Sequence, residues 1–187
     1  PIFSSRAIEL QLHHIEGLSE RFLSLNDDFF LGRPTTAGDF FHKSGEAKLF
    51  TGRRLSRMRP RRLLEESSMV SDSLHNYSVF NARRLVYERC GRVVNYDMWH
   101  GAKVSSRATR YELEREFPGE VENTLSHQFR DKSDFLVSSL EAYYLIATGR
   151  NRPCVMKMYR GERAVYSLSV FRKGRDFVHV PLPRTSM

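Results

Sequence analysis

The sequence predicts an α/β fold, in which a partial Rossmann-like sheet is flanked by helices and a small β-rich segment ends the chain. Three patterns predict this class. The apolar stretch 22–25 runs into Asn26 and two adjacent carboxylates, as a buried strand does at the rim of an α/β sheet. Apolar residues recur at helical spacing within 8–15, 111–117 and 136–147. Apolar and polar residues alternate after residue 155, which is typical of strands.

Length and composition set the limits for this fold. The 187 residues, of which 40% are hydrophobic, suffice for one compact domain or for one domain with a small appendage. No apolar run approaches the roughly 20 residues of a membrane span. The net charge of +8 favours an acidic partner, which could be nucleic acid, an anionic membrane surface or a phosphorylated substrate. Cys90 and Cys154 could form one disulfide, but two isolated cysteines are more often buried thiols.

The first element is predicted to be a short helix. Ser4 or Ser5 can act as the N-cap, and the apolar residues Ile8, Leu12 and Ile15 follow at helical spacing before Gly17. Glu9 and His13 are four residues apart and therefore share a face. From the pattern alone, Glu9 is best interpreted as a solvated acid of the first turn.

A strand is predicted from 21 to 26, and it ends in Asp27-Asp28. One interpretation of the two acids is a turn, because Asp and Asn favour turns. The other is a functional pair, because Phe29 and Phe30 follow at once and adjacent carboxylates near a core need a cation or donors. Local chemistry gives the two interpretations equal weight. Gly32-Arg33-Pro34 then breaks the segment.

A strongly basic segment follows at 52–62, where six residues are arginines. It is interpreted first as a solvated connector, since Pro60 opposes a long helix, and second as an anion-binding arm. No aromatic residue interrupts the run, which weakens a model of stacking on single-stranded nucleic acid.

Three helical segments are predicted in the second half. A short helix is expected at 81–88, a second helix after a cap at Ser105 or Ser106, and a third at 133–148 before Gly149. Pro118-Gly119 should end the second helix, and 121–126 forms a further helical turn. Strands are predicted at 155–159, 164–171 and 176–180.

Two blocks of the chain resemble a known family. The first is PIFSSRAIELQLHHIEGLSERFLSLNDDFFLGRP, residues 1–34, and the second is HGAKVSSRATRYELEREFPGEVENTLSHQFRDKSDFLVSSLEAYYLIATGR, residues 100–150. They are similar to the second half of region two and to region three of the Stealth family. This family includes bacterial capsular polysaccharide phosphotransferases and the catalytic subunit of the animal GlcNAc-1-phosphotransferase.

The resemblance implies an enzyme that moves a hexose or N-acetylhexosamine 1-phosphate from a UDP-sugar to a hydroxyl of a glycan acceptor. The product is a phosphodiester and the leaving group is UMP, as in capsule or cell-surface polysaccharide synthesis. A divalent cation, Mg²⁺ in the first place, is the implied cofactor. The implied location is the cytoplasm or the cytoplasmic membrane face in a bacterium, or the Golgi lumen in an animal-like protein. Nucleic acid is not an expected partner.

The resemblance also implies site residues. The Glu of the AIE motif falls on Glu9 and the second Asp of LNDD on Asp28, while His100 opens region three and Arg130 stands twelve residues after Pro118. These four are the implied catalytic residues. Asp28 and Asp27 are the implied metal ligands. Substrate binding is assigned to Asp27, Asn26, Arg33 and His13. From pattern alone, His100 beside Trp99 is a packed histidine, and Arg130 is a phosphate ligand or an ion-pair partner of Asp131 or Asp134.

The chain also departs from the family pattern. It starts inside region two and lacks the VYTWVNG-like first region, so the resemblance implies a fragment of a longer enzyme. Gly101-Ala102-Lys103 replaces the usual Pro and His after His100, and 177–180 is the nearest match to the last region. The expected organisation is a catalytic portion at 1–150, with a basic connector at about 50–75, and a β-rich tail at 151–187. A non-catalytic remnant that binds polyanions or nucleic acid through its arginines is the alternative, and a transferase that releases UDP is a third possibility.

Overall fold

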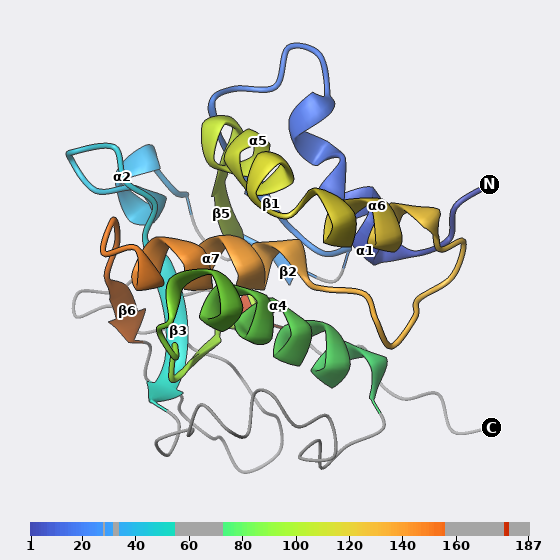
Figure 1. The fold of residues 1–187 in the computed structure, drawn as a ribbon. Helices are drawn as coiled ribbons and strands as arrows, with labels where there is room; N and C mark the ends of the chain where they lie inside the picture. The colour runs from blue at the N-terminus through green and yellow to red at the C-terminus, as the bar shows by residue number, and fades with distance from the viewer. Residues whose placement is uncertain (28, 32–33, 55–72, 156–177, 180–187) are drawn as a thin grey trace, which may run out of the picture. The chain divides into compact units, whose positions relative to one another are not determined.

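The computed structural model describes residues 1–27, 29–31, 34–54, 73–155 and 178–179 (Figure 1). The chain divides into two compact units. Unit 1 contains the described residues of 1–22, 55–95 and 105–152, and unit 2 those of 23–54, 96–104 and 153–187. Each unit is therefore built from segments that are far apart in the sequence.

Unit 1 is helical. Its described residues form the helices α1 (Ser5–Leu10), the short 3₁₀ helix η1 (Leu12–His14), α4 (Leu74–Cys90), α5 (Arg107–Glu116), α6 (Pro118–Ser126) and α7 (Val137–Ala147). Helices α4 and α7 run side by side and pack together (Figure 1). Their facing sides are fully buried at Ala82, Val86, Leu140 and Tyr143. Burial of such side chains is the main favourable term in folding.

The ends of these helices follow local sequence signals. The Ser106 hydroxyl accepts a hydrogen bond from the Thr109 amide at 3.3 Å and so caps α5. Pro118 lies at the first position of α6, where its missing N–H costs nothing. Gly91 and Gly149 follow α4 and α7 with φ of 66° and 75°, a conformation that glycine adopts without strain.

Unit 2 contains small sheets and one short helix, α2 (Ala37–Phe40). Strand β3 (Leu49–Arg54) lies between β4 (Tyr96–Met98), which is antiparallel to it, and β6 (Pro153–Val155), which is parallel to it. Strand β2 (Phe29–Phe30) pairs antiparallel with β7 (Val178–His179). The core of this unit is Phe40, Phe50 and Val104, with Leu23, Phe41 and Trp99 packed against them. A further two-stranded sheet joins β1 (Arg21–Ser24) and β5 (Lys103–Ser106).

The predicted α/β class is confirmed, since helices and strands both build the chain. The described strands form small separate sheets, and a Rossmann-like arrangement is not confirmed by them. The capped helix after Ser106 and the helix before Gly149 are confirmed, although the latter begins at Val137. The strand expected at 21–26 ends at Ser24. The strands expected at 155–159 and 164–171 lie, apart from Val155, outside the described residues.

Three expectations need correction. The first helix ends at Leu10, and its buried side is Ala7 and Leu10, while Ile8 and Ile15 are 53% and 51% exposed. The tighter turn of η1 changes the helical register, so the predicted apolar stripe does not form. The helix expected at 81–88 spans Leu74–Cys90. The expected connector at 50–75 begins inside strand β3, which continues to Arg54.

No described helix has the length and the apolar composition that a membrane crossing requires. Cys90 and Cys154 are both free thiols and partly buried. Burial raises the pKa of each thiol, which keeps it in the less reactive neutral form.

Candidate active site

The residues predicted to form the site belong to both units. Glu9, His13 and Arg130 lie in unit 1, whereas Asn26, Asp27 and His100 lie in unit 2. Asp28 and Arg33 are outside the described residues.

In unit 2, Asn26 and Asp27 form a tight turn between β1 and β2. The Phe29 amide donates a hydrogen bond to the Asn26 carbonyl at 3.1 Å, which closes the turn. Asn26 is half-buried and the Asp27 side chain is exposed. The turn that sequence reasoning held as a rival interpretation is therefore present, and it presents Asp27 to solvent. A turn and a functional role are compatible, because binding groups are commonly placed on loops.

His100 lies beside this turn. Its ring packs edge-on against the Phe29 ring, with centroids 5.0 Å apart and planes at 65°. His100 is exposed, and the Trp99 amide before it donates to the Phe50 carbonyl at 2.9 Å, which ties the segment to β3. The structure thus brings together Phe29 and His100, which are more than 70 positions apart in the sequence.

Gly101 fits this close packing. A Cβ atom at position 101 would lie 2.8 Å from Cδ1 of Trp99, a contact that real side chains do not make. Glycine removes that clash and lets the indole lie against the backbone after His100. A larger residue at position 101 would therefore require Trp99 to move.

In unit 1, Glu9 lies on α1 next to a buried guanidinium. Its carboxylate is 3.9 Å from Nη1 of Arg6, with side chains 16% and 7% exposed. Arg6 also shares a hydrogen bond with Nδ1 of His75 at 3.1 Å. Burial lowers the pKa of Arg6, the Glu9 carboxylate opposes the decrease, and the charge of Arg130 adds to it. Arg6 is therefore within electrostatic range of both Glu9 and Arg130.

Arg130 is presented by a braced loop between α6 and α7. Asp134 accepts hydrogen bonds from His127 Nδ1 at 2.7 Å and from the Asp131 amide at 2.9 Å. The Asn81 side chain donates to the Asp134 carbonyl at 2.9 Å and ties the loop to α4. Arg130 itself is exposed, and its Nη2 donates to the Ser5 hydroxyl at 2.9 Å. The loop thus places an exposed cation at the start of α1.

His13 is placed differently from the other predicted residues. Its side chain is 1% exposed and packs against Tyr111, with ring centroids 4.6 Å apart. Nε2 of His13 lies 3.1 Å from Oε1 of Glu114. Its assignment to substrate binding stays a prediction.

Arg6 was missed by sequence reasoning. It precedes Glu9 by three residues, so one turn of α1 puts the two side chains on the same face. The three-residue spacing could have indicated this pair, but a basic residue near a helix start is ordinarily expected to be exposed to solvent. Its Nε is buried and has no hydrogen-bond partner among the described residues.

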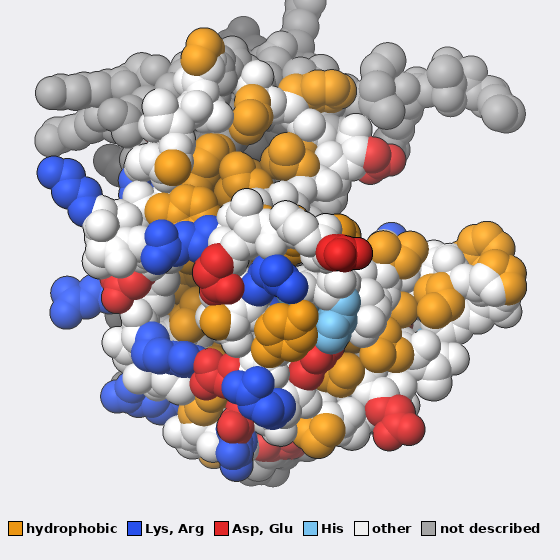
Figure 2. Space-filling model, turned by 90° about the horizontal axis from the view of Figure 1, so that it is seen from above, with side chains coloured by type: hydrophobic (Ala, Val, Ile, Leu, Met, Phe, Trp, Pro, Cys, Tyr) orange, Lys and Arg blue, Asp and Glu red, His pale blue; other side chains and the backbone are white. Residues whose placement is uncertain are grey.

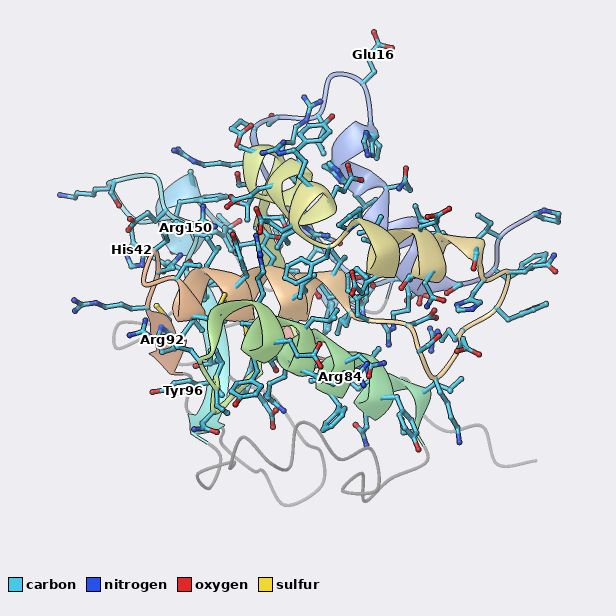
Figure 3. All side chains as sticks on the ribbon, in the orientation of Figure 1. Glu16, His42, Arg84, Arg92, Tyr96 and Arg150 are labelled. Carbon is cyan, nitrogen blue, oxygen red and sulfur yellow. The ribbon has the colours of Figure 1, made fainter. Side chains whose placement is uncertain are left out.

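A pocket of about 230 Å³ lies elsewhere in unit 1 and contains none of the predicted site residues. It is lined by Asn81, Arg84, Leu85, Gly119, Glu120, Asn123 and Ser133. Figure 3 shows one of these residues, Arg84, on α4.

Comparison with known proteins matches both blocks. The family model described as Stealth protein CR2, conserved region 2, matches residues 1–49. The model described as Stealth protein CR3, conserved region 3, matches residues 99–147. Glu9 and the turn at Asn26–Phe29 lie in the first match, and His100 and Arg130 lie in the second.

The chain is also similar to curated bacterial proteins. An exopolysaccharide phosphotransferase of Streptomyces coelicolor is 37% identical over 170 residues, which is 90% of this chain and 30% of the relative. Exopolysaccharide phosphotransferase CpsY of Mycobacterium tuberculosis is 37% identical over 154 residues, covering 82% of this chain and 28% of the relative. A Nocardia farcinica exopolysaccharide phosphotransferase is 37% identical over 154 residues, covering 82% and 29%. The chain thus spans less than a third of the length of these relatives.

Proposed function

Since this chain belongs to the Stealth family, with matches to its conserved regions 2 and 3, we propose that it supplies catalytic residues for sugar-1-phosphate transfer in polysaccharide synthesis. The donor is a UDP-sugar and the acceptor is a hydroxyl group of a glycan. The relatives that it matches are named exopolysaccharide phosphotransferases. The structural observation that carries the proposal is the packing of His100 against Phe29, at the end of the acidic turn.

The proposed reaction is a displacement at phosphorus. The acceptor oxygen bonds to the phosphorus that bears the sugar, and the bond from that phosphorus to the bridging oxygen breaks. UMP leaves with the electron pair, and the proton of the acceptor hydroxyl passes to a base. Catalysis of such a transfer depends on positioning of the reactants and on stabilisation of charge on the phosphoryl oxygens.

Each residue receives a role that its surroundings allow. His100 is exposed and held by Phe29, so it can accept or donate a proton and hydrogen-bond a donor phosphate. Arg130 is an exposed guanidinium on a braced loop, which suits it to bind a phosphate group. Glu9 lies within range of the buried Arg6 charge and serves as a further acid. Asp28 is proposed as a metal ligand or as the base for the acceptor.

The acidic turn suits a hard divalent cation such as Mg²⁺. Asn26 and Asp27 provide an amide oxygen and an exposed carboxylate, and oxygen donors are the ligands that Mg²⁺ prefers. Asp27 and Asp28 are the proposed ligands. The bound cation would offset the negative charge of the diphosphate.

The face shown in Figure 2 gives no particular support, in its described residues, to a polyanion-binding role. On the face shown in Figure 2, basic side chains alternate with acidic ones and with hydrophobic patches. A polyanion is bound most strongly by a continuous surface of a single sign.

The test is transfer by a chimera in which this chain replaces the matched region of the Streptomyces coelicolor relative. The chimera is given a UDP-sugar, the relative's glycan acceptor and Mg²⁺, and the nucleotide product is identified by chromatography. Release of UMP together with a glycan phosphodiester is the expected result. Release of UDP, or a folded chimera without turnover that binds nucleic acid with a steep salt dependence, would contradict the proposal.

A metal titration tests the acidic turn. In the same chimera, Asp28→Asn should raise the Mg²⁺ concentration for half-maximal transfer by about tenfold or more, since a charged oxygen ligand is lost. Asp97→Asn is the matched control, because Asp97 is an exposed aspartate of β4 in the same unit. An equal Mg²⁺ requirement in both variants would remove Asp28 from the proposed ligand set.

A further inference from the structure

Two consecutive histidines of η1 and a glutamate of α5 form a compact cluster in unit 1. Nε2 of His13 and Nε2 of His14 lie 3.1 Å and 2.8 Å from Oε1 of Glu114. One ligand atom from each of the three residues lies within 4.8 Å of the other two. In a tetrahedral zinc site, bonds of about 2.0–2.1 Å place neighbouring ligand atoms about 3.3 Å apart. The two spacings between the imidazole nitrogens and the carboxylate oxygen are close to this value.

The buried histidine of this cluster has unfilled hydrogen-bonding capacity. The His13 side chain is 1% exposed, and its Nδ1 has no hydrogen-bond partner among the described residues. Its Nε2 faces Oε1 of Glu114 at 3.1 Å, but at an angle that is poor for a hydrogen bond. Leaving a buried polar group unsatisfied costs about 1–3 kcal/mol. An ion bound at Nε2 of His13 would supply a partner for it.

The surrounding residues fix the position of the cluster. The Tyr111 ring packs edge-on against both imidazoles, with centroid distances of 4.6 Å to His13 and 5.2 Å to His14. Arg107 Nε donates to the His13 carbonyl at 3.0 Å. Tyr111 and Arg107 both belong to α5, the helix that also bears Glu114. Such support of ligands by neighbouring groups is typical of protein metal sites.

The cluster is open to solvent on one side. The side chains of His14 and Glu114 are 41% and 23% exposed, so an ion can reach them. The nearby Arg110 guanidinium is paired with Glu141 at 2.6 Å, which compensates its charge.

We propose that His13, His14 and Glu114 bind one divalent transition-metal ion, with Zn²⁺ as the first candidate. Two imidazoles and one carboxylate are a ligand set for zinc or a related first-row ion, and a water molecule would take the fourth position. The site differs in chemistry from the acidic turn, which has oxygen donors only.

Metal binding by the chain itself tests this site. The purified chain is stripped with a chelator and titrated with Zn²⁺ by calorimetry and with Co²⁺ by visible absorption, which reports coordination geometry. We expect one ion per chain and a tetrahedral Co²⁺ spectrum. His14→Ala and Glu114→Gln should each weaken Zn²⁺ binding by at least about tenfold to 100-fold. Excess Mg²⁺ should not compete, because it prefers oxygen ligands.

Two matched variants serve as controls. His42→Ala removes an exposed histidine on the loop after α2, and Glu16→Gln removes an exposed carboxylate that points away from the helices at the tip of the loop after η1 (Figure 3). Both should bind Zn²⁺ as the parent chain does. His14 is exposed, so its loss should leave the fold intact, which circular dichroism checks. Zn²⁺ binding that is absent, or that is equal in His14→Ala and His42→Ala, would overturn the proposal.

Discussion

Replacement of Glu141 by alanine should lower the free energy of unfolding by about 3–5 kcal/mol. Glu141 and Arg110 form an ion pair at 2.6 Å in which both side chains are 2% exposed. The same carboxylate accepts hydrogen bonds from the Ser105 hydroxyl at 2.7 Å and from the Ser106 amide at 3.0 Å. Without Glu141, the guanidinium of Arg110 stays buried and unpaired, which is the costly outcome for such a pair.

Urea unfolding of the purified chain, followed by circular dichroism, measures this effect. Glu122→Ala is the matched control, because it removes an exposed glutamate from α6 in the same unit. Surface changes of this kind are usually within about 0.5 kcal/mol. A loss for Glu141→Ala no larger than that of the control would contradict the assigned role of the ion pair.

A paired replacement separates an unpaired charge from lost packing. If Glu141→Ala lowers the stability because the Arg110 guanidinium is left buried and unpaired, then Arg110→Met combined with Glu141→Leu should recover most of the lost stability. Apolar residues of similar volume often replace a buried ion pair without loss of stability. The network also reaches α1, since Arg110 Nη1 donates to the Glu9 carbonyl at 3.5 Å. Glu141 therefore helps to position the helix that bears a proposed catalytic acid.

The sequence predicted those helices whose ends carry clear signals. Ser106 caps α5 as expected, and Gly149 follows α7. The first part of α4 was missed because its buried face is partly polar. Ser78 and Asn81 lie inside the unit, and Asn81 donates to the Lys132 carbonyl at 2.8 Å. Such buried polar residues interrupt the periodic pattern of apolar residues, although tertiary hydrogen bonds satisfy their polar groups. The apolar pattern therefore cannot reveal this part of the helix.

Strand β3 was missed for a related reason. Phe50 and Thr51 are buried. Arg53 and Arg54 follow directly, so the end of the strand was interpreted as part of the basic connector. What makes it a strand is pairing with β4 and β6, which are distant in the sequence. Strand formation depends on such partners more than on local propensity.

The proposed site residues were predicted from resemblance more than from local chemistry. From the local pattern alone, Glu9 was interpreted as a solvated acid and His100 as a packed histidine. No local pattern indicated that His100 lies near the acidic turn. Only the fold places the Phe29 ring against His100. The His13–His14–Glu114 cluster was not predicted either, because its third member is 100 residues away in the sequence.

Replacement of His100 by alanine in the chimera should lower the rate of sugar-phosphate transfer by about 10²–10⁴-fold, the usual contribution of a general acid or base. His100 is exposed, so the loss should not come from unfolding. If His100 acts in the chemical step, kcat falls while KM for the UDP-sugar changes less. If it only binds the donor phosphate, KM rises and kcat is kept.

His42→Ala is the matched control for this experiment, since His42 is an exposed histidine of the same unit. Phe29→Leu tests the packing that holds His100 in place, and it should lower kcat less than His100→Ala does because the imidazole itself remains. An unchanged pH profile in Phe29→Leu, together with loss of one limb of the profile in His100→Ala, would identify the imidazole as the titrating group. Transfer at the parent rate in His100→Ala would rule out its catalytic role, because a residue that contacts the transferring phosphoryl group or its proton cannot be removed without cost.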